Sequence, residues 1–200
     1  MHDGETHPEK QSPGADMRRR ILDAAARSLA ENGYQATTLR GLAQAAGLKA
    51  GSIYYHFSAK EEITVEVLNE GVELVAAAVR DAVAALPDSA DGRAILAAAI
   101  DAHLEALSAH RAYTRASIRC FSMVPEEIRA RTRESRQALD GLWLGILEQA
   151  GEAGAISTGT DLRVLHRILI GALNWTIEQR GDGAAANRAL RETLLNLITR

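Results

Sequence analysis

Cysteine, aromatic residues and long apolar runs are all scarce in this chain of 200 residues. Cys120 is the single cysteine, which excludes an intramolecular disulfide and suits a reducing cytoplasm. No apolar run approaches the roughly 20 residues of a membrane span, and no signal peptide is visible. We therefore expect a cytoplasmic protein without a membrane partner.

The low aromatic content also bears on the fold. Aromatic residues make up only 4% of the chain although hydrophobic residues reach 46%, so the core must consist mainly of Ala, Leu, Ile and Val. This composition favours closely packed helices over a β-sandwich. A glycine-rich phosphate loop, a nucleophile elbow and a His-Glu-x-x-His pattern are all missing, so we predict no catalytic residue, no cofactor and no metal.

Charge is distributed unevenly along the chain. The net charge is −3, but residues 17–60 hold seven Lys/Arg and two Asp/Glu, a local charge of +5 that leaves −8 for the remainder. A basic head on an acidic body is the asymmetry expected of a DNA-binding segment joined to a ligand domain.

Two short helices are predicted at about 38–46 and 50–57, separated by Gly47. Thr37 or Thr38 can cap the first helix, because a hydroxyl accepts a hydrogen bond from a free first-turn N–H. Gly47 can take the left-handed conformation that ends a helix. Two short helices joined by a glycine-containing turn form a helix-turn-helix, whose second helix can enter a DNA major groove.

The second of these helices has a narrow inward row, formed by Ile53 and Phe57. Its remaining surface is polar, small or hydrogen-bonding: Lys49, Gly51, Ser52, Tyr54, Tyr55 and His56. Such side chains suit phosphate oxygens, which take about half to two-thirds of protein–DNA hydrogen bonds. Ser58 to Glu61 is predicted to form a capping box for the next helix. Lys60 opposes the dipole of that helix, which favours a phosphate contact.

From about Arg18 to Val67 the sequence resembles the DNA-binding domain of the TetR family of bacterial transcriptional regulators. The matching residues are Ile21 to Ala25, Glu31 to Tyr34, Thr37-Thr38, Leu42-Ala43, Ala46-Gly47, Ser52 to Phe57 and Lys60 to Glu62. The resemblance implies a homodimer on palindromic double-stranded DNA, most simply a repressor released by a small molecule. A protein-interaction module with a structural helix-turn-helix is the alternative, and a helical enzyme is the least favoured reading.

The family pattern assigns DNA contacts position by position. Base or register contacts fall on Thr38, Arg40, Ala50, Gly51 and Ser52. Phosphate contacts fall on Lys49, Tyr54, Tyr55, His56 and Lys60. Arg18 to Arg20 can either contact phosphate or the minor groove, or form a solvated helix start.

The whole chain is predicted to be all-α, with about nine helices. A disordered tail (1–16) precedes a three-helix helix-turn-helix domain (17–62) and a helical ligand-binding and dimerisation domain (63–200). The expected helices outside the helix-turn-helix span 17–32, 58–86, 91–109, 111–122, 125–150, 161–180 and 184–198.

The helix at 161–180 is apolar on two sides, which requires burial on both. One row is Leu162, Leu165, Leu169, Leu173 and Thr176, and the other is Val164, Ile168, Gly171 and Trp175. Together with the last helix, it fits a four-helix dimer interface, as the resemblance also implies. The predicted contacts are Leu162, Leu165, Leu169, Leu173, Leu190, Leu194 and Leu197. Ordinary burial within one chain is the alternative.

The effector site is predicted from polar and aromatic residues that lie among apolar ones. These candidates are His103, Tyr113, Arg119, Cys120, Trp143, His166, Asn174, Trp175 and Glu178. Ala172 to Thr176 resembles the corresponding helix of family members that sense acyl-coenzyme A thioesters, although Gln179 to Gly181 replace the aromatic residues usual after it. A small hydrophobic or acyl-CoA effector is therefore predicted. The spacing of His103 and His110 is only weakly typical of a metal site.

Overall fold

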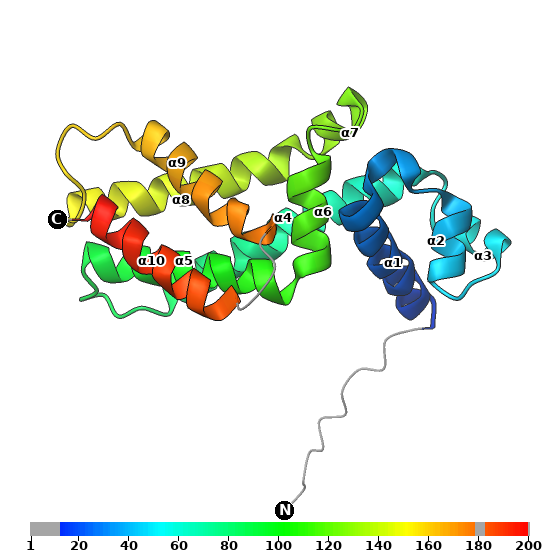
Figure 1. The fold of residues 1–200 in the computed structure, drawn as a ribbon, viewed down its shortest axis with the longest axis horizontal. Helices are drawn as coiled ribbons and strands as arrows, with labels where there is room; N and C mark the ends of the chain where they lie inside the picture. The colour runs from blue at the N-terminus through cyan, green and yellow to red at the C-terminus, as the bar shows by residue number, and fades with distance from the viewer. Residues whose placement is uncertain (1–12, 179–182, 200) are drawn as a thin grey trace, which may run out of the picture.

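The computed structural model describes residues 13–178 and 183–199, which form ten α-helices and one short 3-10 helix (Figure 1). The elements are α1 (Pro13–Ala36), α2 (Leu39–Ala45), α3 (Ala50–His56), α4 (Lys60–Ala84), α5 (Gly92–Ala109), α6 (Arg111–Cys120), α7 (Glu126–Arg131), α8 (Arg133–Glu152), α9 (Leu162–Trp175), η1 (Thr176–Glu178) and α10 (Gly183–Ile198). The all-α prediction is confirmed. Within this part of the chain, extended pairing is limited to one isolated bridge between Ile156 and Thr199.

The molecule divides into a head and a body. In Figure 1 the head (α1 to α3) lies at one end, α4 runs from it into the body, and α6 stands between the two. One apolar core lies in the head and includes Ile21, Leu29, Ile53 and Phe57. The second core lies between α4, α5, α8, α9 and α10 in the body.

Local signals set the helix boundaries in the head. Thr38 is the N-cap of α2, and its hydroxyl accepts a hydrogen bond of 3.1 Å from the Gly41 N–H. Gly47 has a φ of 68°, which permits the turn into α3, as predicted. Gly33 has a φ of 77° and kinks α1, so Tyr34 turns into the head core. The first helix begins at Pro13 rather than Met17, while tail residues 1–12 lie outside the described part.

The predicted capping box of Ser58 and Glu61 is wrong. α4 begins at Lys60, its N-cap is Ala59, and no side chain caps it. Glu62 instead accepts two hydrogen bonds of 2.9 Å from the N–H and hydroxyl of Ser58. Glu61 accepts a hydrogen bond of 2.8 Å from the Tyr34 hydroxyl, so it fastens α4 to the end of α1.

The predicted helix at 125–150 is two helices, and this accounts for the extra helix. The break lies at buried Thr132, whose φ of −106° and ψ of 5° depart from helical geometry. Its N–H lies 3.2 Å from both the Ile128 and Arg129 carbonyls, and its hydroxyl donates to Arg129. The hydroxyl thus satisfies a carbonyl at the end of α7 and stabilises the break.

The helix predicted at 161–180 also ends early. α9 stops at Trp175 and continues as the 3-10 helix η1, because the Thr176 hydroxyl donates to the Leu173 carbonyl. Residues 179 and 180 of that prediction lie outside the described part.

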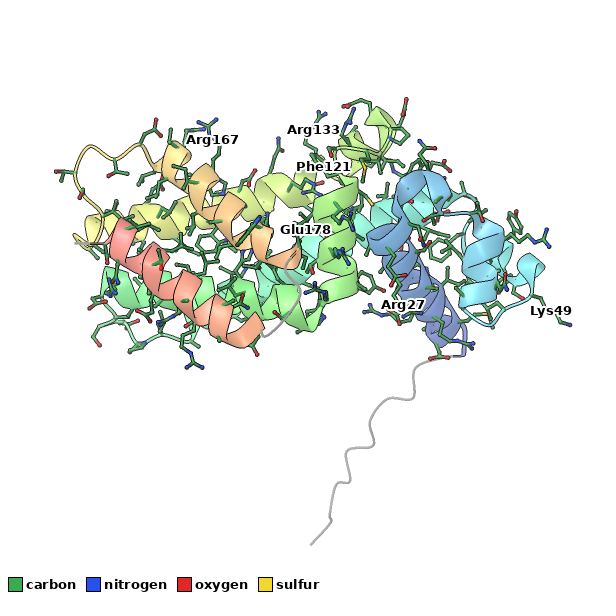
Figure 2. The ribbon with its side chains drawn as sticks, viewed as in Figure 1. Arg27, Lys49, Phe121, Arg133, Arg167 and Glu178 are labelled. Atoms are coloured by element: carbon green, nitrogen blue, oxygen red, sulfur yellow. The ribbon has the colours of Figure 1, made fainter. Side chains whose placement is uncertain are left out.

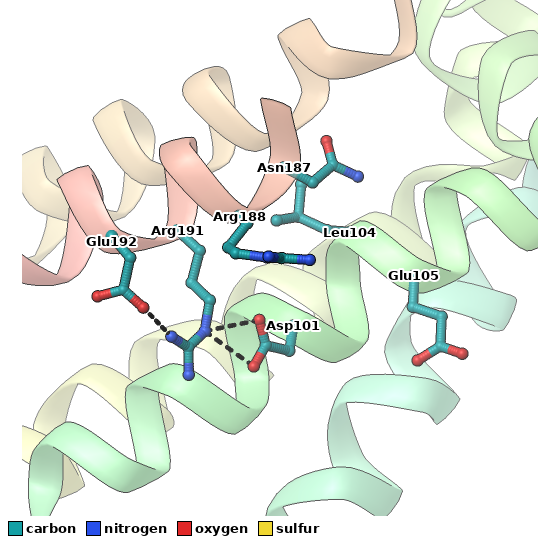
Figure 3. A pocket seen from close by; sticks show the side chains of 7 residues that line it. All are labelled: Asp101, Leu104, Glu105, Asn187, Arg188, Arg191 and Glu192. Atoms are coloured by element: carbon teal, nitrogen blue, oxygen red, sulfur yellow. Dashed lines mark hydrogen bonds and ion pairs between the residues drawn. The ribbon is translucent and has the colours of Figure 1, made fainter. Parts of the chain in front are cut away.

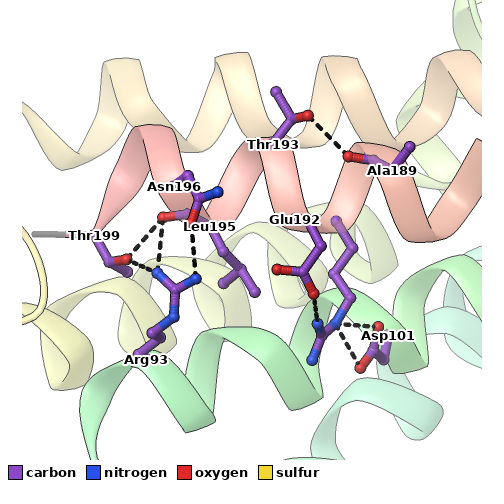
Figure 4. A network of polar contacts seen from close by, with 9 residues as sticks. Arg93, Asp101, Ala189, Glu192, Thr193, Leu195, Asn196 and Thr199 are labelled. Carbon is purple, nitrogen blue, oxygen red and sulfur yellow. Dashed lines mark hydrogen bonds and ion pairs between the residues drawn. The ribbon is translucent and has the colours of Figure 1, made fainter.

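A polar network holds α10 on α5 (Figure 4). Arg93 of α5 donates to the Asn196 side chain at 2.9 Å and also contacts the Thr199 hydroxyl and the Leu195 carbonyl. Arg191 of α10 pairs with Asp101 of α5 at 2.7 Å. The last helix is thereby fixed against the body. No helix within the described ranges is long and apolar enough to cross a membrane.

Candidate DNA-binding surface and effector site

Helix α3 packs against the head core with one face and exposes the other face to solvent. Ile53 and Phe57 are fully buried in the head core. Tyr54 and Tyr55 are 62% and 87% exposed, and the Tyr55 ring meets the half-buried His56 ring edge-on. Large aromatic side chains left in solvent on a short, anchored helix indicate a surface that contacts a partner.

The other predicted DNA contacts lie around α3. Lys49 lies at the outer end of the head (Figure 2), and it is exposed together with Arg40, Gly51 and Thr38. Ser52 is half-buried, and the side chain of Ala50 lies outside the described part. Thr38, Arg40 and Lys49 thus lie exposed on the same domain as α3. Their contacts with DNA remain predictions.

Lys60 has partners inside the head. Its ammonium donates to the Tyr34 carbonyl at 3.1 Å and lies 3.9 Å from the centre of the Tyr34 ring. Burial, and then the hydrogen bond to Glu61, raises the pKa of the Tyr34 hydroxyl to about 12. These contacts explain a lysine in the first turn of α4 without phosphate. A phosphate contact by Lys60 therefore requires its ammonium to bind the phosphate and the Tyr34 carbonyl at the same time.

The three arginines before the helix-turn-helix, Arg18 to Arg20, form contacts with other parts of the protein. Arg18 pairs with Glu66 of α4 and lies over the Phe57 ring. Arg19 pairs with Glu70 of α4 at 3.0 Å. Arg20 donates to the Ala46 carbonyl at 2.7 Å and so closes the end of α2. These contacts brace α1 against α2 and α4.

The predicted effector residues other than Trp175 separate into three places. His103 of α5, Trp143 of α8 and Asn174 of α9 lie together: the imidazole Nε2 is 3.3 Å from the Asn174 Oδ1, and the His103 and Trp143 rings are 5.6 Å apart. His103 and Trp143 are fully buried. Burial lowers the pKa of His103 to about 4, so its imidazole is neutral at neutral pH.

A second group lies where α6 joins the head to the body. Glu178 of η1 pairs with Arg119 at 3.3 Å and with Arg115 at 3.6 Å. Arg119 also donates to the Ala30 carbonyl of α1 at 3.1 Å. The Cys120 thiol is buried against the Leu29 carbonyl, and burial raises its pKa.

Tyr113 belongs to the same junction. Its hydroxyl donates to Asp23 of α1 at 2.7 Å, so α6 holds the head through a polar bond as well as through apolar packing. Tyr113, Arg119 and Cys120 therefore join α6 to α1, and Glu178 joins η1 to α6.

The third place is an open cavity of about 480 Å³ between α8 and α9. It is lined by Asp140, Leu144, Arg163, His166, Arg167 and Ile170. His166 was predicted from the sequence, whereas Arg163 and Arg167 were missed. The signal for them is a pair of basic residues four apart on an otherwise apolar helix. Arg167 lies on the outer side of the body, far from Glu178 (Figure 2).

The charge in this cavity favours an anion. His166 Nε2 is buried and lies 3.5 Å from the Asp140 carboxylate, beyond a well-formed hydrogen bond. Arg163 and Arg167 are exposed and have no ion pair within the described part of the chain. Two guanidinium groups with one nearby carboxylate suit phosphate, which arginine binds in a bidentate manner.

A further groove between α5 and α10 has mixed charge (Figure 3). Arg191 points across it to Asp101 and also contacts Glu192, so its charge is already neutralised. This groove therefore offers no clear preference for a ligand. No cluster of three metal-binding side chains occurs in residues 13–178 and 183–199, and His103 bonds Asn174 rather than pairing with His110.

The predicted dimer residues need a correction. Leu169 and Leu173 are fully buried and Leu194 nearly so, all in the body core, so they cannot meet a second copy. Leu162, Leu165 and Leu190 are half-buried against the same core, and Leu197 is exposed. The row left in solvent is the other one on α9, with Val164, Ile168 and Trp175 at 42%, 62% and 62% exposure. Trp175 thus lies on the outer surface and not with Trp143.

Comparison with known proteins gives the family. Residues 21–67 match the bacterial regulatory proteins of the tetR family, and residues 89–200 match a tetracyclin repressor-like C-terminal domain. The transcriptional repressor KstR2 of Rhodococcus jostii is 32% identical over 81% of this chain and 79% of its own. The fatty acid metabolism regulator protein of Bacillus subtilis is 26% identical over 89% of this chain and 93% of its own.

Solved structures share the fold. The transcriptional regulator FadR of Bacillus subtilis, solved in complex with stearoyl-CoA, has a TM-score of 0.74 and 24% identity, and the match covers 90% of this chain and 98% of that one. An anchored recognition helix, a basic head and these matches across both domains agree. The chain belongs to the TetR family of bacterial transcriptional regulators.

Proposed function

We propose that this regulator is a cytoplasmic homodimeric repressor that binds a palindromic operator and leaves it when a coenzyme A thioester binds the body. The observation that carries the DNA-binding part is the exposed Tyr54 and Tyr55 face of α3, anchored by Ile53 and Phe57. Thr38, Arg40, Gly51 and Ser52 would fix base register, while Lys49, Tyr54, Tyr55, His56 and Lys60 would contact phosphates.

The effector class is supported by the chemistry of the body and by the relatives. The cavity at Arg163, His166 and Arg167 has a volume within the range of small-molecule sites and a cationic lining. Coenzyme A carries several phosphate groups, and a thioester adds an apolar tail of the same chemistry as the body core. A relative named for fatty acid metabolism, and a FadR structure holding stearoyl-CoA, support the same class.

The route from effector to DNA would pass through the α6 junction. Tyr113 and Arg119 of α6 bond Asp23 and Ala30 in α1. Glu178 of η1, at the end of α9, pairs with Arg119 and so joins that end to α6. An effector that shifts α9 would therefore change the contacts that set the position of the head. The change in operator affinity on addition of the effector is the measurement that tests this route.

The first test is selection of fragmented genomic DNA on the purified protein, followed by sequencing of the bound fragments. A palindromic site should be enriched, and octanoyl-CoA or stearoyl-CoA should release it while free coenzyme A should not. Enrichment without release by any thioester would reject the effector class and keep the DNA-binding function. No enrichment, with or without cell extract, would count against the operator proposal.

The rival function is a protein-interaction module with a structural helix-turn-helix. It predicts binding to DNA that is weak and independent of sequence. Arg40→Ala separates the two, because Arg40 is exposed in the first turn of α2 and a base-reading arginine contributes about 1–3 kcal/mol of discrimination. Equal losses on the selected site and on random DNA would move Arg40 to the phosphate-contacting group.

A further inference from the structure

Among the buried polar atoms that have no hydrogen-bond partner in the described part of the chain, two belong to rings that contact each other in the body. They are the Nδ1 of His103 and the Nε1 of Trp143, on side chains that are 1% and 0% exposed. The two rings are in contact, with centroids 5.6 Å apart and planes inclined by 57°. A buried polar atom without a partner is rare in native proteins and costs stability, so this adjacent pair requires an explanation.

The hydrogen-bonding roles of the two atoms follow from their surroundings. His103 Nε2 lies 3.3 Å from the Asn174 Oδ1, and an amide oxygen only accepts, so Nε2 carries the proton. The imidazole is neutral because burial lowers its pKa to about 4, which leaves Nδ1 as a bare acceptor. The indole N–H of Trp143 can only donate. One acceptor and one donor therefore belong to two rings whose centroids are 5.6 Å apart.

The surroundings of this pair are hydrocarbon. Trp143 belongs to the body core together with Leu147, Leu169 and Leu173. Asn174 is half-buried, so the cluster reaches the surface at the end of α9, where the α-helix gives way to η1. A group that satisfies the pair would have to arrive on an otherwise apolar ligand.

We propose that His103 and Trp143 select an effector that carries a hydroxyl group on its apolar part. The hydroxyl would donate to His103 Nδ1 and accept from the Trp143 N–H, and it is the smallest organic group that does both. A saturated chain leaves both atoms unpaired, and a ketone can only accept. The inference rests on the proposed thioester effector and narrows its class.

The magnitude of the preference follows from the cost of leaving a buried group unpaired. Sites built to hydrogen-bond a ligand hydroxyl discriminate strongly against the analogue without it. One neutral hydrogen bond in a buried site corresponds to about tenfold in affinity. We therefore expect the hydroxylated ligand to bind at least about tenfold more tightly than its saturated counterpart.

The test uses calorimetric titration of the full chain with matched thioesters. The series is octanoyl-CoA, a set of hydroxyoctanoyl-CoA isomers in which one hydroxyl moves carbon by carbon along the chain, and the ketone that corresponds to the tightest isomer. One isomer should exceed octanoyl-CoA by about tenfold or more, and its ketone should not. Trp143→Phe should remove this preference, so that the tightest isomer and octanoyl-CoA bind the variant within about threefold of each other.

Trp175→Phe is the matched control, because Trp175 is exposed on the outer face of α9 and should leave the preference intact. Equal binding of every isomer and of octanoyl-CoA would overturn this inference but leave a thioester effector standing. A preference for the ketone would also overturn it, since a ketone only accepts and cannot pair with the acceptor at His103 Nδ1. A lowered unfolding midpoint of the unliganded Trp143→Phe protein without any preference would mean that the pair has a purely structural role. Failure of every thioester to bind would reject the effector class and this inference together.

Discussion

At the scale of single residues, Lys60 is expected to contribute both to the stability of the head and to DNA binding. Its ammonium has three N–H donors, and the structure accounts for one of them at the Tyr34 carbonyl, 3.1 Å away. Lys60→Ala should lower the free energy of unfolding by about 1–2 kcal/mol, because a half-buried charged hydrogen bond and a ring contact are lost. It should also weaken binding to all DNA sequences alike and reduce the salt slope by about one phosphate.

Lys49→Ala is the matched control for this prediction. Lys49 is exposed at the start of α3, so its loss should change the salt slope but not the unfolding midpoint. A salt slope that stays the same in Lys60→Ala would assign Lys60 to the head structure alone.

His103 gives a residue-scale prediction about pH. Its folded pKa of about 4 lies below the ordinary value of 6.5, so the unfolded chain binds the proton more tightly. Stability from this group is therefore present above pH 6.5 and is lost as pH falls from 6.5 towards 4. Between pH 7 and pH 5 the loss should be about 2 kcal/mol.

Urea unfolding at the two pH values, with His103→Gln and His110→Gln, isolates this contribution. His103→Gln should reduce the difference between the two pH values by about 2 kcal/mol. His110→Gln is the matched substitution at an exposed position. The same difference in all three proteins would show that His103 does not titrate as its burial implies.

At the scale of elements, the contact between α4 and α6 depends on Gly71. A Cβ added there would lie 2.4 Å from the Tyr113 carbonyl oxygen and 2.9 Å from the Ser117 Cβ. Gly71→Ala should therefore separate the two helices and lower the free energy of unfolding by about 1–3 kcal/mol. Gly145→Ala in α8 meets nothing within 4 Å and should be neutral or stabilising. Equal stability of the two variants would refute this close packing.

The same scale shows what the sequence can and cannot predict. Glycine, proline and capping hydroxyls act locally, so Thr38, Gly47 and the end of α4 before Pro87 were predicted. The break at Thr132 was not, because it depends on a side chain that satisfies a carbonyl in a buried place. The sequence also did not show that the predicted effector residues lie in separate places. Arg119 and Trp143 both lie among apolar residues in the sequence, and only the folded structure separates them.

At the scale of the whole molecule, α9 decides how two copies can meet. Its two apolar rows are equivalent in sequence, and packing against α5 and α8 uses the row of Leu169 and Leu173. The row of Val164, Ile168 and Trp175 remains in solvent, and α10 adds Leu197, which is 77% exposed. We expect these exposed side chains to form the centre of the dimer interface, because a stable interface has an apolar core and a polar rim.

Ile168→Asp tests this assignment, because a carboxylate at the centre of an apolar interface is costly to bury. Sedimentation velocity should show the wild-type chain as a dimer and the variant as a monomer with unchanged helicity. Operator affinity should fall at least about tenfold, because two heads would no longer bind two half-sites as one unit. Met123→Asp, also at an exposed apolar position but between α6 and α7, should remain dimeric. A dimeric Ile168→Asp protein would place the interface away from this row of α9.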